Sequence, residues 1–349
     1  MTRRALTAWC VAVLVALGVW GGLPGAQVWA GEGKELVTYG MPEEGPWAEI
    51  FQTFCKENNC KHVDTDMTSA QAITKFLAER NRPVAVSTEV GILFGPLATR
   101  QGAALAYKNA HWDRIPAWAK DANGNWFAVY AGVPTFLVNK AVVKAIPQSW
   151  QDLLKPEYKN SIAFKDPRES GTAVAMLLAA TVANGGGPGN LTPGIAYFKK
   201  LFQAGNVKAT SPSTSNIQKG EVPITIRYDH ENLITKERFK KELELEVVMP
   251  SDGSLYTPSA IVLNRFAPDP ALARAFADFL LSDRGQLILA RSLTRPIRSI
   301  AGSLEVPADI RGRWLPEDLY KSRVRIVENW EGFSVDEIRE RWTNEVLAR

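Results

Sequence analysis

The stretch that decides the fold is ELVTYGMPEEGPWAEIFQTFCKENNCKHVDTDMTSAQAITKFLAERNRPVAVST, residues 35–88. Short apolar runs alternate in it with longer segments whose apolar residues recur at helical spacing. The predicted strands are 35–40, 62–67 and 83–88, and the predicted helices are 46–56 and 70–80. Strands and helices in this βαβαβ order predict a parallel sheet with helices on both faces.

A second series of strands and helices follows, and 349 residues are enough for about two domains. The predicted strands are 127–140, 161–166, 206–210, 223–229, 243–250 and 257–264, and the predicted helices are 172–183, 193–203 and 270–291. The tail 307–349 is charged, and we expect its tryptophans to pack it onto the rest of the chain. They are Trp314, Trp330 and Trp342. The predicted fold class is α/β.

Composition and motifs argue against several classes of function. The net charge is only +4 and no basic patch stands out, so nucleic acid is not an expected partner. The sequence contains no G-x-S-x-G, H-E-x-x-H, P-loop or dinucleotide-binding G-x-G-x-x-G motif. Asp229 and His230 are neighbours on a predicted strand, so their side chains point to opposite faces and make a poor start for a catalytic triad. We therefore expect neither an enzyme nor a cofactor.

The N-terminus has the pattern of a secretory signal peptide, residues 1–30. Arg3 and Arg4 precede an uncharged, mostly apolar run over residues 5–20, and the small-residue sequence VWA closes the segment. The apolar run is shorter than the roughly 20 residues that a membrane span requires. The pattern predicts export to the periplasm and cleavage near Ala30, and leaves the choice between the Sec and twin-arginine routes open.

Two cysteines remain after the signal peptide, Cys55 and Cys60, in the sequence FCKENNC. In an oxidising compartment, two cysteines this close in sequence favour a disulfide. The alternative is a metal site with His62, but one histidine and two thiols are an incomplete ligand set. We expect the disulfide rather than a metal site at these residues, and whether the protein binds a metal ion elsewhere stays open.

One candidate ligand site lies in KDPRESGTAVAML, residues 165–177. Ser170 is a natural N-cap, and Gly171 and Thr172 begin a helix with no bulky side chain near its end. A helix start offers free N–H groups and a partial positive charge, and glycine lets a ligand approach the backbone. The segment predicts an anion site, with an ordinary capped helix as the alternative.

Four further segments carry a resemblance to a known family. They are GVPTFLVNKAVVKAIPQSWQDLLKPEYKNSIAFKDPRESGTAVAML (132–177), GEVPITIRYDHEN (220–232), MPSDGSLYTPSAIVLN (249–264) and ADFLLSDRGQLILA (277–290). The chain resembles the periplasmic solute-binding proteins of ABC importers. It is most similar to their cluster that binds iron(III), sugar phosphates, phosphonates, thiamine and polyamines. The resemblance covers nearly all of the chain after the signal peptide.

This resemblance implies a two-lobe clamshell of periplasmic-binding-protein type 2, in which each lobe is a mostly parallel sheet flanked by helices. It assigns residues 31–132 and 257–349 to lobe 1 and residues 133–256 to lobe 2, with two crossover strands as the hinge. It also implies a periplasmic monomer that captures a small-molecule solute by closure of the lobes. The monomer then delivers the solute to an ABC permease in the inner membrane.

By position, the resemblance assigns ligand contacts to strand ends and to the helix start described above. The residues are Tyr39, Gly40, Glu89, Ser170, Gly171, Thr172, Arg227, Tyr228, Asp229 and Tyr256. Tyr228 and Asp229 are expected to point into the cleft, so that Asp229→Ala abolishes binding and leaves the fold intact. Arg227 either pairs with Asp229 or holds an anion. His230 is either a ligand contact or part of the first turn of a helix.

The expected ligand class rests partly on a departure from the family. Iron(III)-binding members usually present two adjacent tyrosines, whereas here Tyr228 is followed by Asp229. Ser-Gly-Thr at a helix start suits phosphate, phosphonate or carboxylate, so a small polar anion such as a phosphorylated sugar or an aminophosphonate is expected. The alternatives are iron(III), a polyamine or thiamine held by acidic side chains, and a periplasmic sensor that uses the same fold.

Overall fold

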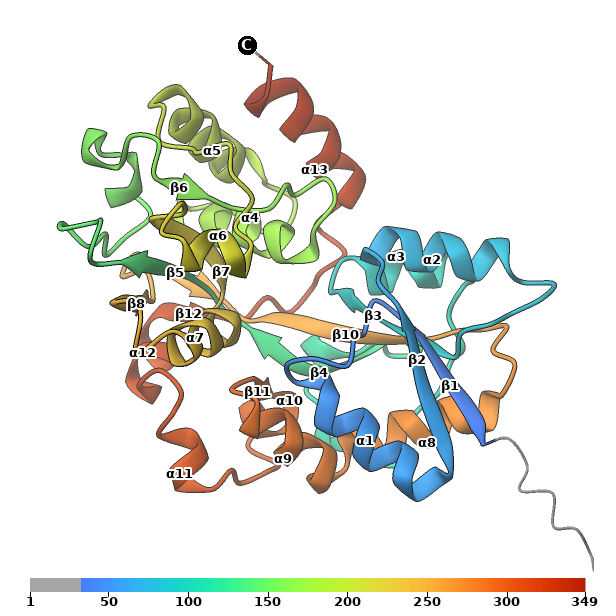
Figure 1. Cartoon of the computed structure of the whole chain (residues 1–349). Helices are drawn as coiled ribbons and strands as arrows, with labels where there is room; N and C mark the ends of the chain where they lie inside the picture. Colours follow the sequence, from blue (N-terminus) through green and yellow to red (C-terminus); the bar gives the residue numbers. More distant parts are fainter. Residues whose placement is uncertain (1–32, 349) are drawn as a thin grey trace, which may run out of the picture. The chain divides into compact units, whose positions relative to one another are not determined.

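A computed structural model describes residues 33–348, so the predicted signal peptide lies outside the described residues. From Lys34 onward the chain forms one compact unit. None of the helices within residues 33–348 is long and apolar enough to cross a membrane. Figure 1 shows two larger sheets flanked by helices, with the chain passing from one sheet to the other.

The first sheet contains the predicted βαβαβ unit. Its strands lie in the order β11-β4-β10-β3-β1-β2. Their bounds are β1 Lys34–Tyr39, β2 Cys60–Thr65, β3 Ser87–Gly91, β4 Phe127–Gly132, β10 Thr257–Leu263 and β11 Arg295–Pro296, and the helices of the unit are α1 Trp47–Asn58 and α2 Ser69–Ala78. β1 pairs in parallel with both β2 and β3, which confirms the predicted unit. We call this sheet and its helices lobe 1.

The second sheet, which with its helices forms lobe 2, has the order β6-β7-β5-β8. Its strands are β5 Pro134–Asn139, β6 Ile162–Ala163, β7 Ile224–Tyr228 and β8 Leu245–Val248. β5 runs antiparallel to β7 and β8, and β10 runs antiparallel to both of its neighbours in the first sheet. The expectation of mostly parallel sheets is therefore wrong, and both sheets are mixed.

The passage of the chain between the lobes explains this mixture. The segment 127–140, predicted as one strand, is two strands that break at Val133 and belong to different sheets. β4 carries the chain out of lobe 1 and β10 carries it back, so these two neighbouring strands run in opposite directions. Alternation of apolar residues predicted the strands but contained no signal for the change of sheet.

The remaining helices flank the two sheets. They are α3 Phe94–Arg100, α4 Gly171–Ala183, α5 Thr192–Gln203, α6 Thr214–Gln218, α7 Asp229–Arg238, α8 Pro270–Leu281, α9 Asp283–Arg291, α10 Ile297–Ile300, α11 Ala308–Arg311, α12 Glu317–Arg323 and α13 Val335–Arg341, with short turns of helix at Trp112–Arg114, Ala117–Ala119, Asp152–Leu154, Pro156–Tyr158 and Trp342–Val346. The predicted helix 270–291 is interrupted at Ser282, whose extended backbone ends α8 and whose Oγ caps α9. The predicted strand 206–210 amounts to one bridge, between Val207 and Ile162.

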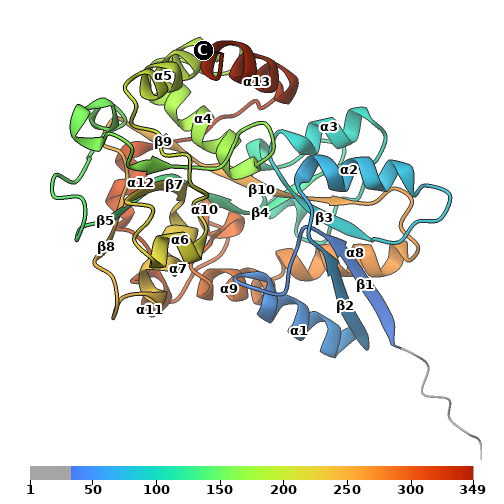
Figure 2. The ribbon, with the colours of Figure 1, turned by 45° about the horizontal axis from the view of Figure 1, so that its top comes forward.

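The tail packs through its tryptophans, as predicted, because Trp314, Trp330 and Trp342 are all buried. Its last part, however, lies on lobe 2 rather than on lobe 1, where the resemblance placed it. β12 (Val324–Arg325) pairs with β9 (Ser254–Leu255), and the ring of Trp342 lies 5.2 Å from that of Phe198 in α5. Figure 2 shows α13 beside α5. The tail packs Trp342 against Phe198 and Phe202 of α5, a pairing that sequence alone did not reveal.

The expected disulfide between Cys55 and Cys60 is present and joins the end of α1 to the start of β2. The two cysteines are only 5 residues apart in sequence. Because the closed loop is short, the bond restricts the unfolded chain modestly, by about 2 kcal/mol.

Reduction of this bond is therefore expected to lower the melting temperature by about 4 °C and to leave the fold intact. The measurement is thermal unfolding with and without dithiothreitol. The double variant Cys55→Ser/Cys60→Ser serves as the control, because it should melt like the reduced protein and should not respond to the reductant. A melting temperature that falls equally in the double variant on reduction would contradict this assignment.

Candidate functional site

A cavity of about 1060 Å³ lies between the two lobes. Lobe 1 lines it with the loop after β1, the start of α2 and the end of β3, and lobe 2 lines it with the loop before α4 and the start of α7. Six of the ten predicted contact residues line this cavity: Gly40, Glu89, Ser170, Gly171, Thr172 and Tyr228. The fold therefore brings six of the predicted residues, from both lobes, to one cleft.

The starts of α2 and α4 meet across this cavity. A Cβ atom placed on Gly171, the first residue of α4, would lie 3.3 Å from the Cα of Gly91 and 3.8 Å from the Oγ of Ser69. Ser69 is the first residue of α2, and its Oγ accepts a hydrogen bond from the N–H of Gly91 at 3.1 Å. The lobes are thus in contact at this point, and the two glycines allow their backbones to come this close.

The first turn of α4 has N–H groups available for a ligand. Ser170 is its N-cap, as predicted, and the Ser170 Oγ accepts a hydrogen bond from the N–H of Ala173 at 3.4 Å. The N–H groups of Gly171 and Thr172 precede the first hydrogen bonds within the helix and have no acceptor there. Both residues line the cavity.

The first turn of α2 has the same character. Thr68 is its N-cap, and Thr68 and Gln71 form a capping box. Neither α2 nor α4 has an acidic residue in its first turn. Two helix starts from different lobes, neither with an acidic residue in its first turn, therefore present partial positive charge to the same cavity.

Glu89 lies at the floor of the cavity and already has several donors. Its Oε2 accepts a hydrogen bond from Trp47 Nε1 at 2.6 Å, and its Oε1 accepts hydrogen bonds from the hydroxyls of Tyr130 and Ser259. Burial raises the pKa of Glu89, and these three hydrogen bonds oppose that rise. Because its oxygens are occupied, Glu89 positions Tyr130 and Ser259 and shapes the floor.

Tyr228 and His230 form an aromatic pair at the other side of the floor. A Cβ on Gly132 would lie 2.5 Å from Cδ1 of Tyr228, so glycine at the crossover makes room for this ring. His230 stacks on Tyr228 with ring centroids 5.5 Å apart and meets Tyr130 edge-on at 5.4 Å. His230 lies in the first turn of α7, which confirms that interpretation, and it also lines the cavity. Its contact with a ligand stays a prediction.

The expectation that Asp229 points into the cleft is not met. Its Oδ1 accepts a hydrogen bond from the N–H of Val133 at 2.9 Å, and its Oδ2 accepts one from the Tyr320 hydroxyl at 2.6 Å. β7 ends at Tyr228 and the chain turns into α7, which directs Asp229 under the crossover, where it is 1% exposed. Asp229 therefore ties the break between β4 and β5 to the tail.

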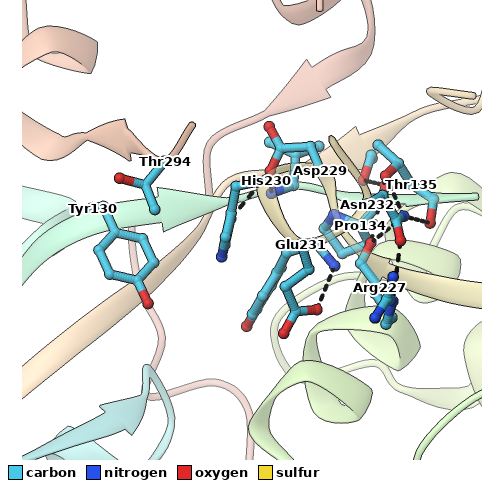
Figure 3. A network of polar contacts seen from close by, with 12 residues as sticks. Tyr130, Pro134, Thr135, Arg227, Asp229, His230, Glu231, Asn232 and Thr294 are labelled. Atoms are coloured by element: carbon cyan, nitrogen blue, oxygen red, sulfur yellow. Dashed lines mark hydrogen bonds and ion pairs between the residues drawn. The ribbon is translucent and has the colours of Figure 1, made fainter. Parts of the chain in front are cut away.

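Arg227 also lies outside the cavity lining, and it does not pair with Asp229. Its Nε donates to Oδ1 of Asn232 at 3.1 Å and its Nη2 donates to Oγ1 of Thr235 at 2.9 Å, both in α7. Burial lowers its pKa. Figure 3 shows Arg227 beside Asn232, away from Tyr130. The alternation of side chains along β7 places Arg227 and Tyr228 on opposite faces of the strand.

Tyr39 and Tyr256 likewise do not line the cavity. The Tyr39 hydroxyl donates to Oε2 of Glu79 at 2.5 Å, and burial together with this carboxylate raises the pKa of Tyr39. Tyr256 stacks on Tyr320 with ring centroids 6.2 Å apart, next to the crossover. Burial raises its pKa to about 12. These rings pack the lobe and the hinge.

Sequence reasoning missed several residues of the cavity. They are Asp66, Met67, Thr68, Ser69 and Gln71 near the start of α2, and Phe164, Phe202, Val207, Trp342 and Leu347 on lobe 2. A signal for the first group was present, because Thr68 and Gln71 form the T-x-x-Q pattern of a capping box. The second group comes from distant parts of the chain and had no local signal. Within residues 33–348, no group of three or more His, Cys, Asp or Glu side chains is arranged to hold a metal ion.

The family model for bacterial extracellular solute-binding proteins matches residues 91–323, which include both crossovers and most of the cleft. The chain belongs to this family. Solute-binding proteins of this family are transport components rather than enzymes, and they deliver small molecules to ABC permeases.

One relative and one solved structure are similar to this chain. The chain is 26% identical over 266 residues to a putative 2-aminoethylphosphonate-binding periplasmic protein of Salmonella typhimurium, covering 73% of this chain and 75% of the relative. The structure of this chain is similar to that of the periplasmic binding protein AfuA from Actinobacillus pleuropneumoniae with bound fructose-6-phosphate. That likeness has a TM-score of 0.77 at 24% identity and covers 90% of this chain and 99% of AfuA.

The same fold also occurs with a different ligand. Iron-bound HitA from Pseudomonas aeruginosa matches with a TM-score of 0.71 at 18% identity, covering 89% of this chain and 99% of HitA. The two-lobe fold is therefore shared by proteins whose ligands differ in chemistry. The fold alone therefore does not determine the ligand of this solute-binding protein, which depends on the residues of its own cavity.

Proposed function

We propose that this protein captures a small anionic solute, a phosphate ester, phosphonate or carboxylate, in the periplasm and delivers it to an ABC permease. The observation that carries the proposal is the meeting of two helix starts, α2 from lobe 1 and α4 from lobe 2, at Ser69 and Gly171. Neither first turn contains an acidic side chain that would neutralise it. An anion placed there joins the lobes, because each helix start attracts it.

This arrangement also accounts for capture by closure. In the open form each helix start faces water, and the anion binds one of them weakly. In the closed form the anion is held by N–H and hydroxyl groups of both lobes in a site with less water, where charge-assisted hydrogen bonds are stronger. The ligand therefore favours the closed form over the open form, which is the requirement for a population shift.

Two relatives support the anionic class, since one is described as binding 2-aminoethylphosphonate and another was solved with fructose-6-phosphate. A second candidate is a polyamine or another cation. It is favoured by acidic side chains of the cavity lining, namely Asp66, Glu89, Asp166, Glu169 and Glu231. Of these, Asp166 is already paired with Arg168, whose Nη2 lies 2.7 Å from its Oδ2, and Glu89 has its own donors.

The variant Thr172→Asp separates the two candidates. A carboxylate in the first turn of α4 repels an anion in the cavity, so affinity for an anion should fall at least about tenfold. The same carboxylate stabilises the helix start, so the melting temperature of the free protein should not fall. Affinity for a cation would rise instead.

The measurement is isothermal titration calorimetry after a thermal-shift panel of hexose phosphates, aminoethylphosphonate, Fe(III)-citrate, thiamine, spermidine and putrescine. Thr192→Asp is the matched control, because Thr192 begins α5 and does not line the cavity. Unchanged anion affinity in Thr172→Asp would show that the anion is not bound at α4. A rise in melting temperature with the amines alone would show that the ligand is a cation and not an anion.

A further inference from the structure

Several apolar side chains line the cavity beside Lys165 and Lys208, and two of them belong to the C-terminal tail. The apolar residues are Phe164, Phe202, Val207, Pro212, Trp342 and Leu347, and we call them the tail-side wall. Phe164, Phe202, Val207 and Leu347 are only half-buried, so apolar surface remains open to the cavity. Half-buried apolar side chains that line a ligand cavity are the feature that binds the apolar part of a ligand.

The tail-side wall is held in place by buried contacts. Trp342 is 1% exposed, and its ring centroid lies 6.3 Å from that of Phe164 and 6.1 Å from that of Phe202. Nε of Arg339 donates to the carbonyl of Arg168 at 3.0 Å, which fixes α13 to the loop before α4. The wall is therefore preformed and does not require the ligand to order it.

The tail-side wall and the proposed anion site share one loop, which contributes Phe164 to the wall. A single loop leads from β6 to α4, with Phe164 at its beginning and Ser170 at its end, and both line the same cavity. The cavity of about 1060 Å³ is also far larger than an anionic head group of a few atoms needs, because pockets of about 300–1000 Å³ hold drug-sized molecules.

We propose that the solute carries an apolar group, an aromatic ring or a branched alkyl chain, attached to its anionic group, and that the tail-side wall receives this group. The inference rests on the proposed anion site at α2 and α4 and specifies the rest of the ligand. It also gives the C-terminal tail a role in ligand selection through Leu347, which contacts the ligand directly.

The test compares two ligands with the same head group, methylphosphonate and benzylphosphonate, by isothermal titration calorimetry on the purified protein. Benzylphosphonate should bind at least about tenfold more tightly, because its apolar ring is transferred from water to the tail-side wall. Leu347→Ser should weaken benzylphosphonate about fivefold and leave methylphosphonate unchanged. Ile326→Ser is the matched control, since Ile326 belongs to the same tail, is 48% exposed and does not line the cavity.

The outcomes separate this inference from the proposed function. Equal affinity for the two phosphonates would overturn the apolar subsite and leave the anion site standing. Equal weakening of both ligands by Leu347→Ser would also overturn it, because the tail would then act on the fold rather than on the apolar group. Binding of neither phosphonate, together with a thermal shift by amines, would overturn the anion site and this inference with it.

Discussion

Replacing Gly171 by valine is expected to weaken solute binding by about tenfold to a hundredfold while the free protein stays folded. A Cβ at this position would lie 3.3 Å from the Cα of Gly91 in the form in which the lobes touch, and valine adds two further methyl groups. Overpacking of this kind costs about 1–3 kcal/mol. The cost falls on the closed form alone, so it lowers affinity rather than stability, at about 1.4 kcal/mol for each factor of ten.

The control for this experiment is Gly187→Val. Gly187 also lies in lobe 2, and a Cβ on it would meet no atom within 4 Å. Neither Gly187 nor Gly171 has the left-handed backbone that valine would strain. Affinity is measured by calorimetry with the best ligand of the thermal-shift panel, and closure by small-angle scattering with and without it. Wild-type affinity in Gly171→Val would show that the contact between Gly91 and Gly171 is not needed for binding.

Replacing Asp229 by alanine is expected to destabilise the protein by about 3 kcal/mol or more, because two hydrogen bonds to a charged group are lost. The N–H of Val133 and the hydroxyl of Tyr320 would remain buried without this acceptor. The melting temperature should fall by roughly 5–10 °C. Ligand affinity of the folded fraction should change little, since Asp229 does not line the cavity. This expectation reverses the one that sequence position alone suggested.

The measurement is urea unfolding, with Asp113→Ala, an exposed aspartate of lobe 1, as the control. Loss of binding without loss of stability in Asp229→Ala would restore a role for this carboxylate in the site.

Acid should act through the same carboxylate. Burial alone raises the pKa of Asp229, but the neighbouring His230, the Tyr320 hydroxyl and the Val133 N–H together hold it below its ordinary value. A carboxyl with a lower pKa in the folded state contributes stability above its unfolded pKa of about 3.9 and loses it as the pH falls towards the folded pKa. The variant Asp229→Asn should therefore lose less stability than the wild type when the pH is lowered through this window.

Local patterns in the sequence determined several parts of this protein. The βαβαβ unit of lobe 1, the N-cap of α4 at Ser170 and the disulfide between Cys55 and Cys60 were all predicted and are present. Each depends on residues close together in the chain, where apolar spacing, capping or loop length is visible directly. The helix start at Gly171, which we propose as the anion site, was predicted by the same reasoning.

Only the tertiary structure decided what depends on distant contacts. The Asp229 carboxylate points away from the cavity because it accepts hydrogen bonds from the N–H of Val133 and the hydroxyl of Tyr320. These two residues lie 96 and 91 positions away in sequence. The mixed sheets follow from strands that pass between lobes, and the tail-side wall follows from the packing of Trp342 on lobe 2. A buried polar group needs a hydrogen-bond partner, but that partner can come from any part of the chain that folding places beside it. A periodic sequence pattern shows that a residue is buried and does not show which distant residue it contacts.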